Sequence, residues 1–404
     1  MTIHPNMNAD MNTDTNTNTN TQIPAGLVMS TRAWRWAGSA IALLIVGASA
    51  CGDDGIGDSD SQSSATATEG STSGDSETDT STDASTTGTD TDSGTETETG
   101  TTTGGGGQTY PNPDDAPSYD GKAFVGMQIY DVEAELWMDE LALMEALDVS
   151  RLVLVGEQHE TPAIHELQRW MLEHLLLRHG DVTLAMEHFQ SDEQDVINSY
   201  LAGDIDSDTF ESTSDPWNNY SKYWKQLVDT MKLAERPVLG VNVPSEALDS
   251  VYAAFPSPPL EVFNGWGESF PYDAYLPPRP LDGWDAVYQG YFEQSYDYES
   301  HGKDWGLTYE EALDYFTALA LIRDDTMGYF IARHLENTDD RVLMVGGDWH
   351  VQTGLATADS VTKFTADVEP VLVTTTPLGG LDELLLEGYG DRPVADYVLV
   401  YEPL

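Results

Sequence analysis

The chain has 404 residues, and its 70 Asp and Glu against 17 Lys and Arg give a formal net charge of −53 at pH 7. A surface with this sign repels phosphate groups, which excludes a protein whose main role is to bind nucleic acid or anionic lipid by electrostatic attraction. The single cysteine, Cys51, excludes a disulfide framework and any metal site built from several cysteines of one chain.

The first fifty residues predict a lipoprotein export signal. Residues 1–28 are rich in Asn and Thr without periodicity, so we expect a disordered or untranslated segment before a start at Met29. Residues 29–51 combine two arginines, a short apolar run and Ala-Ser-Ala before Cys51, in the order of a signal peptide. These small residues resemble a bacterial lipobox, which predicts a lipid on Cys51 that anchors the protein to the cell envelope, on its periplasmic or surface side. The alternative is ordinary cleavage that leaves a free thiol.

Residues 52–107 have the composition of a linker. They contain Gly, Ser, Thr, Asp, Glu, Ala, Gln and one Ile, with no Lys, Arg or aromatic residue. Such a segment cannot bury enough apolar surface to offset the entropy of folding, so we expect it to be disordered and acidic. As a flexible coil it would span roughly 40 Å, and it would hold the remaining domain away from the membrane.

Residues 108–404 predict an α/β fold with a mainly parallel sheet. Continuous apolar runs without alternation indicate strands that are buried on both faces, and helical stretches lie between them. Strands and helices in alternation favour a parallel sheet flanked by helices, and ligands of such sheets bind beyond the carboxyl ends of the strands. The expected strands are 151–155, 182–186, 237–241, 341–345, 370–374 and 395–401, and the expected helices are 162–179, 191–202, 221–235 and 310–336.

Ionisable residues collect directly after these strands. Glu157 and His159 follow the first strand, Glu187 the second and His350 the fourth. Two carboxylates and two imidazoles at one edge of the sheet could bind a divalent metal or activate water for hydrolysis. The alternative is a buried network of hydrogen bonds and ion pairs. His188 is expected to point to the opposite face from Glu187 and is excluded from the site.

Four further residues have both a functional and a structural interpretation. His165 and Gln168 share a face near the start of the first helix, where they would support the site or cap the helix. Asn242 would contribute to the site or only to a turn. Arg323 would clamp a carboxylate of a ligand or form an internal ion pair with Asp324.

Several segments, spread over about residues 120–360, together carry a family resemblance. They are 154–168, 184–189 with Gln194, 200–203, Trp217 with Tyr220 or Tyr223, 240–246, 323–327 and 346–350. These segments resemble the ChaN family of haem-binding lipoproteins, which is similar to the wider TIKI, TraB and erythromycin-esterase group. Ile164 and Trp349 depart from the family pattern where a histidine and a glycine are usual. The resemblance implies a parallel sheet flanked by helices with a smaller helical lobe.

The resemblance also implies haem binding and iron handling. Tyr200, Tyr220 and Tyr223 lie in matching segments, and any of them could be the axial iron ligand. Residues 252–309 are rich in aromatic side chains, which would form a wall for a porphyrin or simply the core of a lobe. Two porphyrins held face to face between subunits would make the protein a homodimer.

Two functions from different classes therefore stay open. The first is a membrane-tethered haem or iron-porphyrin carrier outside the cytoplasm. The second is a metal-dependent esterase or peptidase that uses Glu157, His159, Glu187 and His350. The sequence contains no Gly-x-Ser-x-Gly, phosphate-binding loop or His-Glu-x-x-His motif, which excludes the serine hydrolases, P-loop nucleotidases and zincins that carry these motifs.

Overall fold

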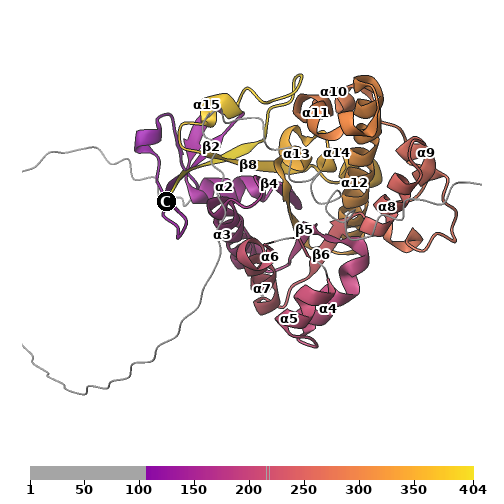
Figure 1. Ribbon diagram of the computed structural model, residues 1–404. Coiled ribbons are helices and arrows are strands. Elements are labelled where there is room, and N and C mark those ends of the chain that lie inside the picture. Colours follow the sequence, from indigo (N-terminus) through magenta and orange to yellow (C-terminus); the bar gives the residue numbers. More distant parts are fainter. Residues whose placement is uncertain (1–105, 215, 218) are drawn as a thin grey trace, which may run out of the picture.

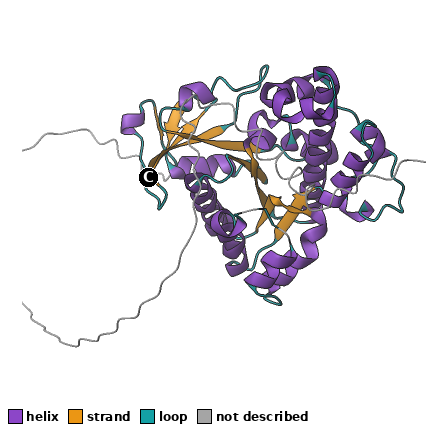
Figure 2. Cartoon of the chain, in the orientation of Figure 1, coloured by secondary structure: helices purple, strands orange, loops and turns teal. Residues whose placement is uncertain are grey.

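The computed structural model describes residues 106–214, 216–217 and 219–404, so the predicted signal peptide, Cys51 and almost all of the predicted linker lie outside the described residues. The described chain forms a nine-stranded sheet in the order β1-β3-β2-β9-β8-β4-β7-β5-β6, with helices packed against both faces (Figures 1 and 2). The predicted α/β class with a mainly parallel sheet is confirmed.

The parallel part of the sheet contains the strands that the apolar runs predict. In β4 all six residues are buried, so no polar and apolar alternation marks the strand, because helices cover both of its faces. The strands are β4 (Leu152–Glu157), β5 (Val182–Gln190), β6 (Val238–Asn242), β7 (Arg341–Gly347), β8 (Val371–Pro377) and β9 (Tyr397–Pro403).

Three further strands form an antiparallel edge that the sequence does not reveal. These are β1 (Thr109–Tyr110), β2 (Phe124–Asp131) and β3 (Leu136–Met138), and β2 pairs antiparallel with β9. Two of them are only two or three residues long. In β2 the register shifts between Val125 and Gln128, and Gly126 has a positive φ of 64°. This irregularity interrupts the alternation by which a half-buried strand is normally identified.

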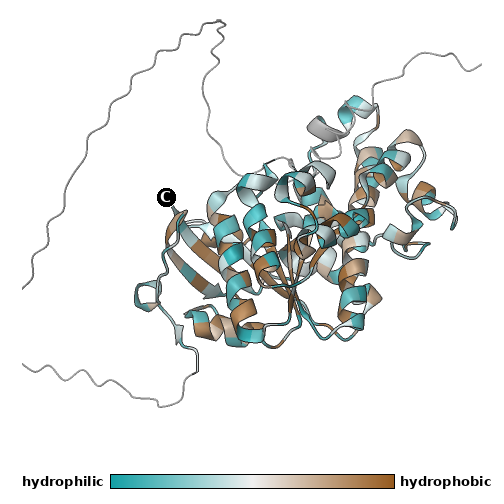
Figure 3. Ribbon diagram, turned by 90° about the horizontal axis from the view of Figure 1, so that it is seen from below, coloured by the Kyte–Doolittle hydropathy of each residue, from teal (hydrophilic) through white to brown (hydrophobic). Residues whose placement is uncertain are grey.

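The helices that position the site are α3 and α7 on one face of the sheet and α12 and α14 on the other. Alternate residues of β4 separate the faces: Val153 and Val155 pack in the core that includes α3, whereas Leu152 and Leu154 pack in the core that includes α12. Figure 3 shows the hydrophobic strands enclosed between helices with hydrophilic outer turns. None of the described helices is long and apolar enough to cross a membrane.

Two helices show why their sequences begin where they do. Helix α3 begins at Pro162, whose fixed φ suits a first helical residue. Helix α12 has a capping box between Thr308 and Glu311. The helices are α2 (Glu140–Leu147), α3 (Pro162–His179), α4 (Gln194–Ala202), α5 (Ser207–Thr213), α6 (Tyr220–Tyr223), α7 (Lys225–Leu233), α8 (Ser245–Ala253), α9 (Pro259–Asn264), α10 (Ala286–Ser295), α11 (Tyr298–His301), α12 (Tyr309–Asn337), α13 (Asp348–Val351), α14 (Thr357–Phe364) and α15 (Leu381–Leu384).

The aromatic-rich segment packs into a second core beside the amino-terminal half of α12. Tyr252, Phe263, Tyr288, Tyr291 and Phe292 are all buried there, together with side chains of α12 and α13. Large aromatic side chains bury much apolar area each, which suits the core of a small helical region. The structure therefore supports the interpretation of these residues as the core of the lobe.

Candidate functional site

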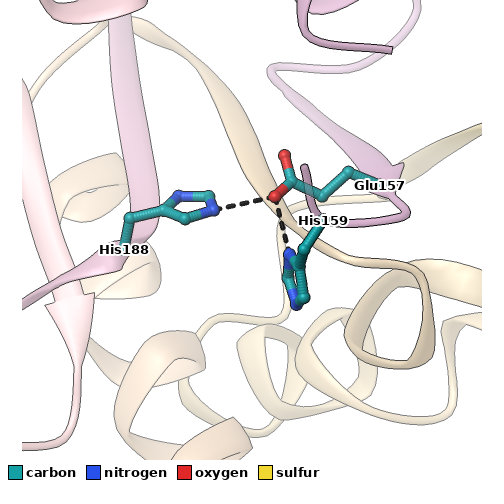
Figure 4. A group of neighbouring side chains, drawn as sticks. All are labelled: Glu157, His159 and His188. Carbon is teal, nitrogen blue, oxygen red and sulfur yellow. Dashed lines mark hydrogen bonds and ion pairs between the residues drawn. The ribbon is translucent and has the colours of Figure 1, made fainter. Parts of the chain in front are cut away.

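The carboxylate of Glu157, at the end of β4, lies at the centre of the site. It is fully buried, and four side chains donate hydrogen bonds to it. His159 Nδ1 and His188 Nε2 donate to Oε1 at 2.8 and 2.9 Å (Figure 4). Gln168 Nε2 donates to Oε2 at 2.7 Å, and Trp224 Nε1 lies 3.0 and 3.2 Å from the two oxygens.

The exclusion of His188 is wrong. Adjacent residues of β5 do point in different directions, since Glu187 contacts His350 and His188 contacts Glu157. At this end of the sheet, however, polar groups occupy both directions. The rings of Trp217 and Trp224 lie 4.8 and 4.4 Å from the His188 ring and enclose it. Alternation along a strand therefore does not tell whether a residue belongs to a site at the strand end.

Two glycines leave room for this arrangement. Strand β7 lies between β4 and β5 and ends at Gly346 and Gly347. A Cβ atom on Gly346 would lie 3.0 Å from Glu187 Oε2, and one on Gly347 would lie 3.1 Å from His159 Nε2. Because β7 carries no side chain here, residues from β4 and β5 fill the space above it.

A second group of charged residues forms around His350. His350 Nε2 lies 3.3 Å from Glu187 Oε1, and Nδ1 donates to Asp324 Oδ1 at 2.8 Å. The backbone N–H of Gly347 donates to Glu187 Oε2 at 2.8 Å. The four residues expected to form one cluster are thus divided: Glu157 and His159 join His188, whereas Glu187 and His350 join Asp324.

Within each of the two groups, side chains of opposite charge stabilise each other. Burial alone would raise the pKa of Glu157, but His188, His165 and His159 outweigh it and hold this pKa well below its usual range. Burial would likewise lower the pKa of His350, but Glu187 and Asp324 raise it to about 10. His350 is therefore protonated at neutral pH.

The four further candidate residues make different contacts in the structure. Gln168 accepts a hydrogen bond from His165 Nδ1 at 3.1 Å while it donates to Glu157, so both residues orient the buried carboxylate and neither caps the helix. Asn242 donates to the backbone carbonyl of Glu187 at 3.0 Å and closes the strand end. Arg323 lies beside the Tyr252 hydroxyl and lowers the pKa of that group against the effect of its burial.

The three candidate tyrosines lie in different surroundings. Tyr200 donates to Asp229 at 2.6 Å and stacks on Phe210. Tyr220 is 2% exposed and also packs against Phe210. Tyr223 lines a cavity of about 210 Å³ that also involves His165, and the two rings lie 5.1 Å apart.

The two departures from the expected motif have different consequences. Ile164 is buried in the main core beside the site. Trp349 turns into the lobe, where it stacks on Tyr291 at 5.5 Å with an interplanar angle of 12°. His350, the residue that follows Trp349, still contacts Glu187. The bulky residue therefore changes the lobe side of the site without displacing the histidine.

Three site residues escape sequence reasoning. No sequence pattern predicts the contacts of Trp224 and Asp324, although both lie in or beside segments of the family resemblance. Asp348 accepts a hydrogen bond from Thr374 at 3.0 Å, and burial raises its pKa to about 7. Its carboxylate rests against Gly156, where the absence of a side chain permits the close approach.

The fold and the site define an α/β protein whose polar centre lies at the carboxyl edge of a mainly parallel sheet. Residues 143–361 match the family model described as haem-binding uptake, Tiki superfamily, ChaN. This match covers more than half of the chain, and the protein belongs to the ChaN family of the Tiki superfamily. The resemblance seen in the sequence is confirmed.

One solved structure supports the family assignment at the level of the fold, and a more distant one is similar only in part. ChaN of Campylobacter jejuni, whose structure describes cofacial haem binding, has 17% identity and a TM-score of 0.51, and the match covers 71% of this chain and 100% of that chain. An erythromycin esterase mutant in its open conformation has 12% identity and a TM-score of 0.35, over 64% of this chain and 79% of that chain. No curated protein sequence matches the chain.

Replacing Gly156 by alanine should destabilise the protein, because the new Cβ atom would overlap the Asp348 carboxylate. We expect a loss of roughly 1–3 kcal/mol in the free energy of unfolding, measured by urea titration. The matched control is Gly267→Ala, because no atom lies within 4 Å of a Cβ at that position. Equal stability of the two variants would contradict the tight packing of Asp348 on β4.

The protonated His350 should stabilise the fold in a pH-dependent way. Its folded pKa of about 10 lies above the unfolded value near 6.5, so its contribution is complete below about pH 6.5, declines as the pH rises and is lost above about pH 10. His350→Gln should therefore destabilise the protein more at pH 6 than at pH 9. The difference should shrink by up to about 1.4 kcal/mol per pH unit, and a constant difference would contradict a charged imidazole.

Proposed function

We propose that this protein binds haem or another iron porphyrin and hands it on outside the cytoplasm, tethered to the cell envelope through a lipid on Cys51. The observation that carries the haem assignment is the family match over residues 143–361. The signal-like residues 29–51 and the linker-like residues 52–107 support the export and the tether.

The cavity beside Tyr223 has the donor set that a haem requires. A phenol oxygen is a known axial ligand of haem iron, and Tyr223 accepts a hydrogen bond from Lys222 Nζ at 2.5 Å. Lys122 and Arg169 line the same cavity together with Glu166, and Arg169 already pairs with Glu173 at 2.6 Å. Positive groups are scarce in this chain, and Lys122 would pair with a propionate of a haem here.

The size of this cavity suits the edge of a porphyrin. Its volume of about 210 Å³ lies below the roughly 300–1,000 Å³ of sites that enclose a small molecule. A haem held here through Tyr223 would keep much of its surface outside the cavity. A second subunit could cover that surface with its own haem, which supports a homodimer with two porphyrins face to face.

Replacing Tyr223 by phenylalanine should weaken haem binding at least tenfold, because the iron would lose its oxygen ligand. Haemin titration of the full chain, followed by the shift of the Soret band, measures the affinity. Tyr200→Phe is the matched control, since the Tyr200 hydroxyl is held by Asp229 and lines neither described cavity. Equal affinity of the Tyr223 variant and the wild type would remove Tyr223 as the ligand, and no Soret shift in the wild type would overturn haem binding.

A second candidate function, a metal-dependent hydrolase, is favoured by one specific observation. Among the described residues, Glu157, His159 and His188 offer ligand atoms that all lie within 4.8 Å of one another. One carboxylate and two imidazoles match the ligands of a catalytic zinc site, which lowers the pKa of a bound water. Glu187 and His350 lie beside this group, where His350 contacts Glu187 and Asp324 through its two ring nitrogens.

A metal at this position should depend on all three ligands. After incubation with Zn²⁺ and dialysis, the full chain is expected to retain about one ion, measured by mass spectrometry. Glu157→Gln and His188→Ala should retain none. His174→Ala is the control, because His174 pairs with Glu140 away from the site. Zinc retained equally by all variants, or by none including the wild type, would reduce the group to a hydrogen-bond network that stabilises the fold.

A further inference from the structure

A second and larger cavity lies beside the Glu157 site. Its volume is about 580 Å³, within the range of pockets that enclose small molecules. Its walls come from α10, the start of α13, the end of β8 and α15 with the turn that follows it. Gln158 and Asp348 line the cavity, and they directly follow Glu157 of β4 and Gly347 of β7. The cavity therefore borders the same carboxyl edge of the sheet as the site.

The lining of this cavity is acidic. Asp348, Glu383 and Glu387 contribute carboxyl groups, and no Lys, Arg or His belongs to the lining residues. Burial, and to a smaller degree repulsion from the neighbouring Glu383, raise the pKa of Glu387. A positively charged ligand would relieve this repulsion, whereas the propionates of a haem would increase it.

Two buried hydrogen-bonding groups in the lining lack a partner among the described residues. The indole nitrogen of Trp349 and the hydroxyl of Thr375 both belong to side chains that are more than nine-tenths buried. Buried polar atoms are normally satisfied, so a ligand in this cavity would meet two hydrogen-bonding groups of its wall that no described residue occupies. The Trp349 ring, stacked on Tyr291, also supplies an aromatic face of the kind that attracts organic cations.

The carboxylates of the cavity do not form a chelating group. Among the described residues, Glu157, His159 and His188 bring three ligand atoms close together, and neither Glu383 nor Glu387 belongs to such a group. A divalent ion needs its oxygen ligands at about 2–2.6 Å, which requires close clustering. A larger cation, which can reach carboxylates that are spread along a wall, fits the lining better.

We propose that this cavity binds a small organic cation that carries an ammonium or guanidinium group. Glu383 and Glu387 would pair with the charge, and Trp349 would pack against the attached apolar part. The far end of such a ligand would lie next to Gln158, beside Glu157 and His159. The proposal rests on the cavity alone and holds whether or not haem binds at Tyr223.

The test uses three probes that share one ring and differ in charge: benzylamine, benzyl alcohol and benzoate. Their binding to the full chain is measured at pH 7 by ligand-observed NMR titration. Benzylamine is expected to bind at least tenfold more tightly than the other two. Glu387→Gln and Glu383→Gln should each weaken benzylamine binding severalfold, and they concern exposed side chains whose neutralisation leaves the fold intact.

Two further variants separate this result from general attraction and from haem binding. Glu336→Gln removes an exposed charge on α12 outside the lining and should leave benzylamine binding unchanged. Tyr223→Phe should also leave it unchanged, since Tyr223 lines the other cavity. The proposal is overturned if benzylamine binds no better than benzyl alcohol, if neither lining variant weakens it, or if Glu336→Gln weakens it equally.

Discussion

The carboxylate of Glu157 has no access to water, so the protein alone must stabilise its charge. The donors come from four parts of the fold: His159 after β4, Gln168 on α3, His188 on β5, and Trp224 at the junction of α6 and α7. Each donor fixes one element relative to the end of β4. Loss of any one partner would destabilise the fold, because water could not reach the buried carboxylate to replace the lost hydrogen bond. The hydrogen bonds to Glu157 therefore help to fix where these elements lie over this edge of the sheet.

Much of the fold could be predicted because the central strands are buried on both faces and read as uninterrupted apolar runs. The antiparallel edge could not, since β1 and β3 are very short and the pattern of β2 is broken at Gly126. For the candidate site, the rule that polar residues at strand ends converge predicted that Glu157, His159, Glu187 and His350 lie at one edge of the sheet, which is where the structure places them. It could not tell that they divide into two groups, because the partners that divide them, His188 and Asp324, are chosen by packing across the sheet. Neither residue has a sequence spacing that reveals this contact.

The tryptophan that precedes His350 links the lobe to the sheet. Trp349 lies at the carboxyl end of β7, yet its ring packs with Tyr288, Tyr291 and Phe292 of α10. The Tyr291 hydroxyl in turn donates to the Trp349 carbonyl at 2.9 Å. The lobe is thus fixed to the same turn that supplies His350 and Asp348. Two neighbouring residues of the short helix α13 therefore contact different surroundings. Trp349 faces the aromatic core and the acidic cavity, whereas His350 faces the buried carboxylates.

Gly156, Gly346 and Gly347 contribute only backbone to the centre of the protein, and side chains from neighbouring strands occupy the space above them. Each of these glycines therefore constrains the side chains that lie above it. A change at Glu187 or His188 alters one group of contacts and can be compensated by its direct partners. A side chain at Gly347 would press on His159, whose Nε2 would lie 3.1 Å from the new Cβ atom, and a side chain at Gly346 would press on Glu187, whose Oε2 would lie 3.0 Å away. A descendant of this chain with new chemistry at the sheet edge is therefore expected to have replaced its charged residues one at a time while it kept these glycines.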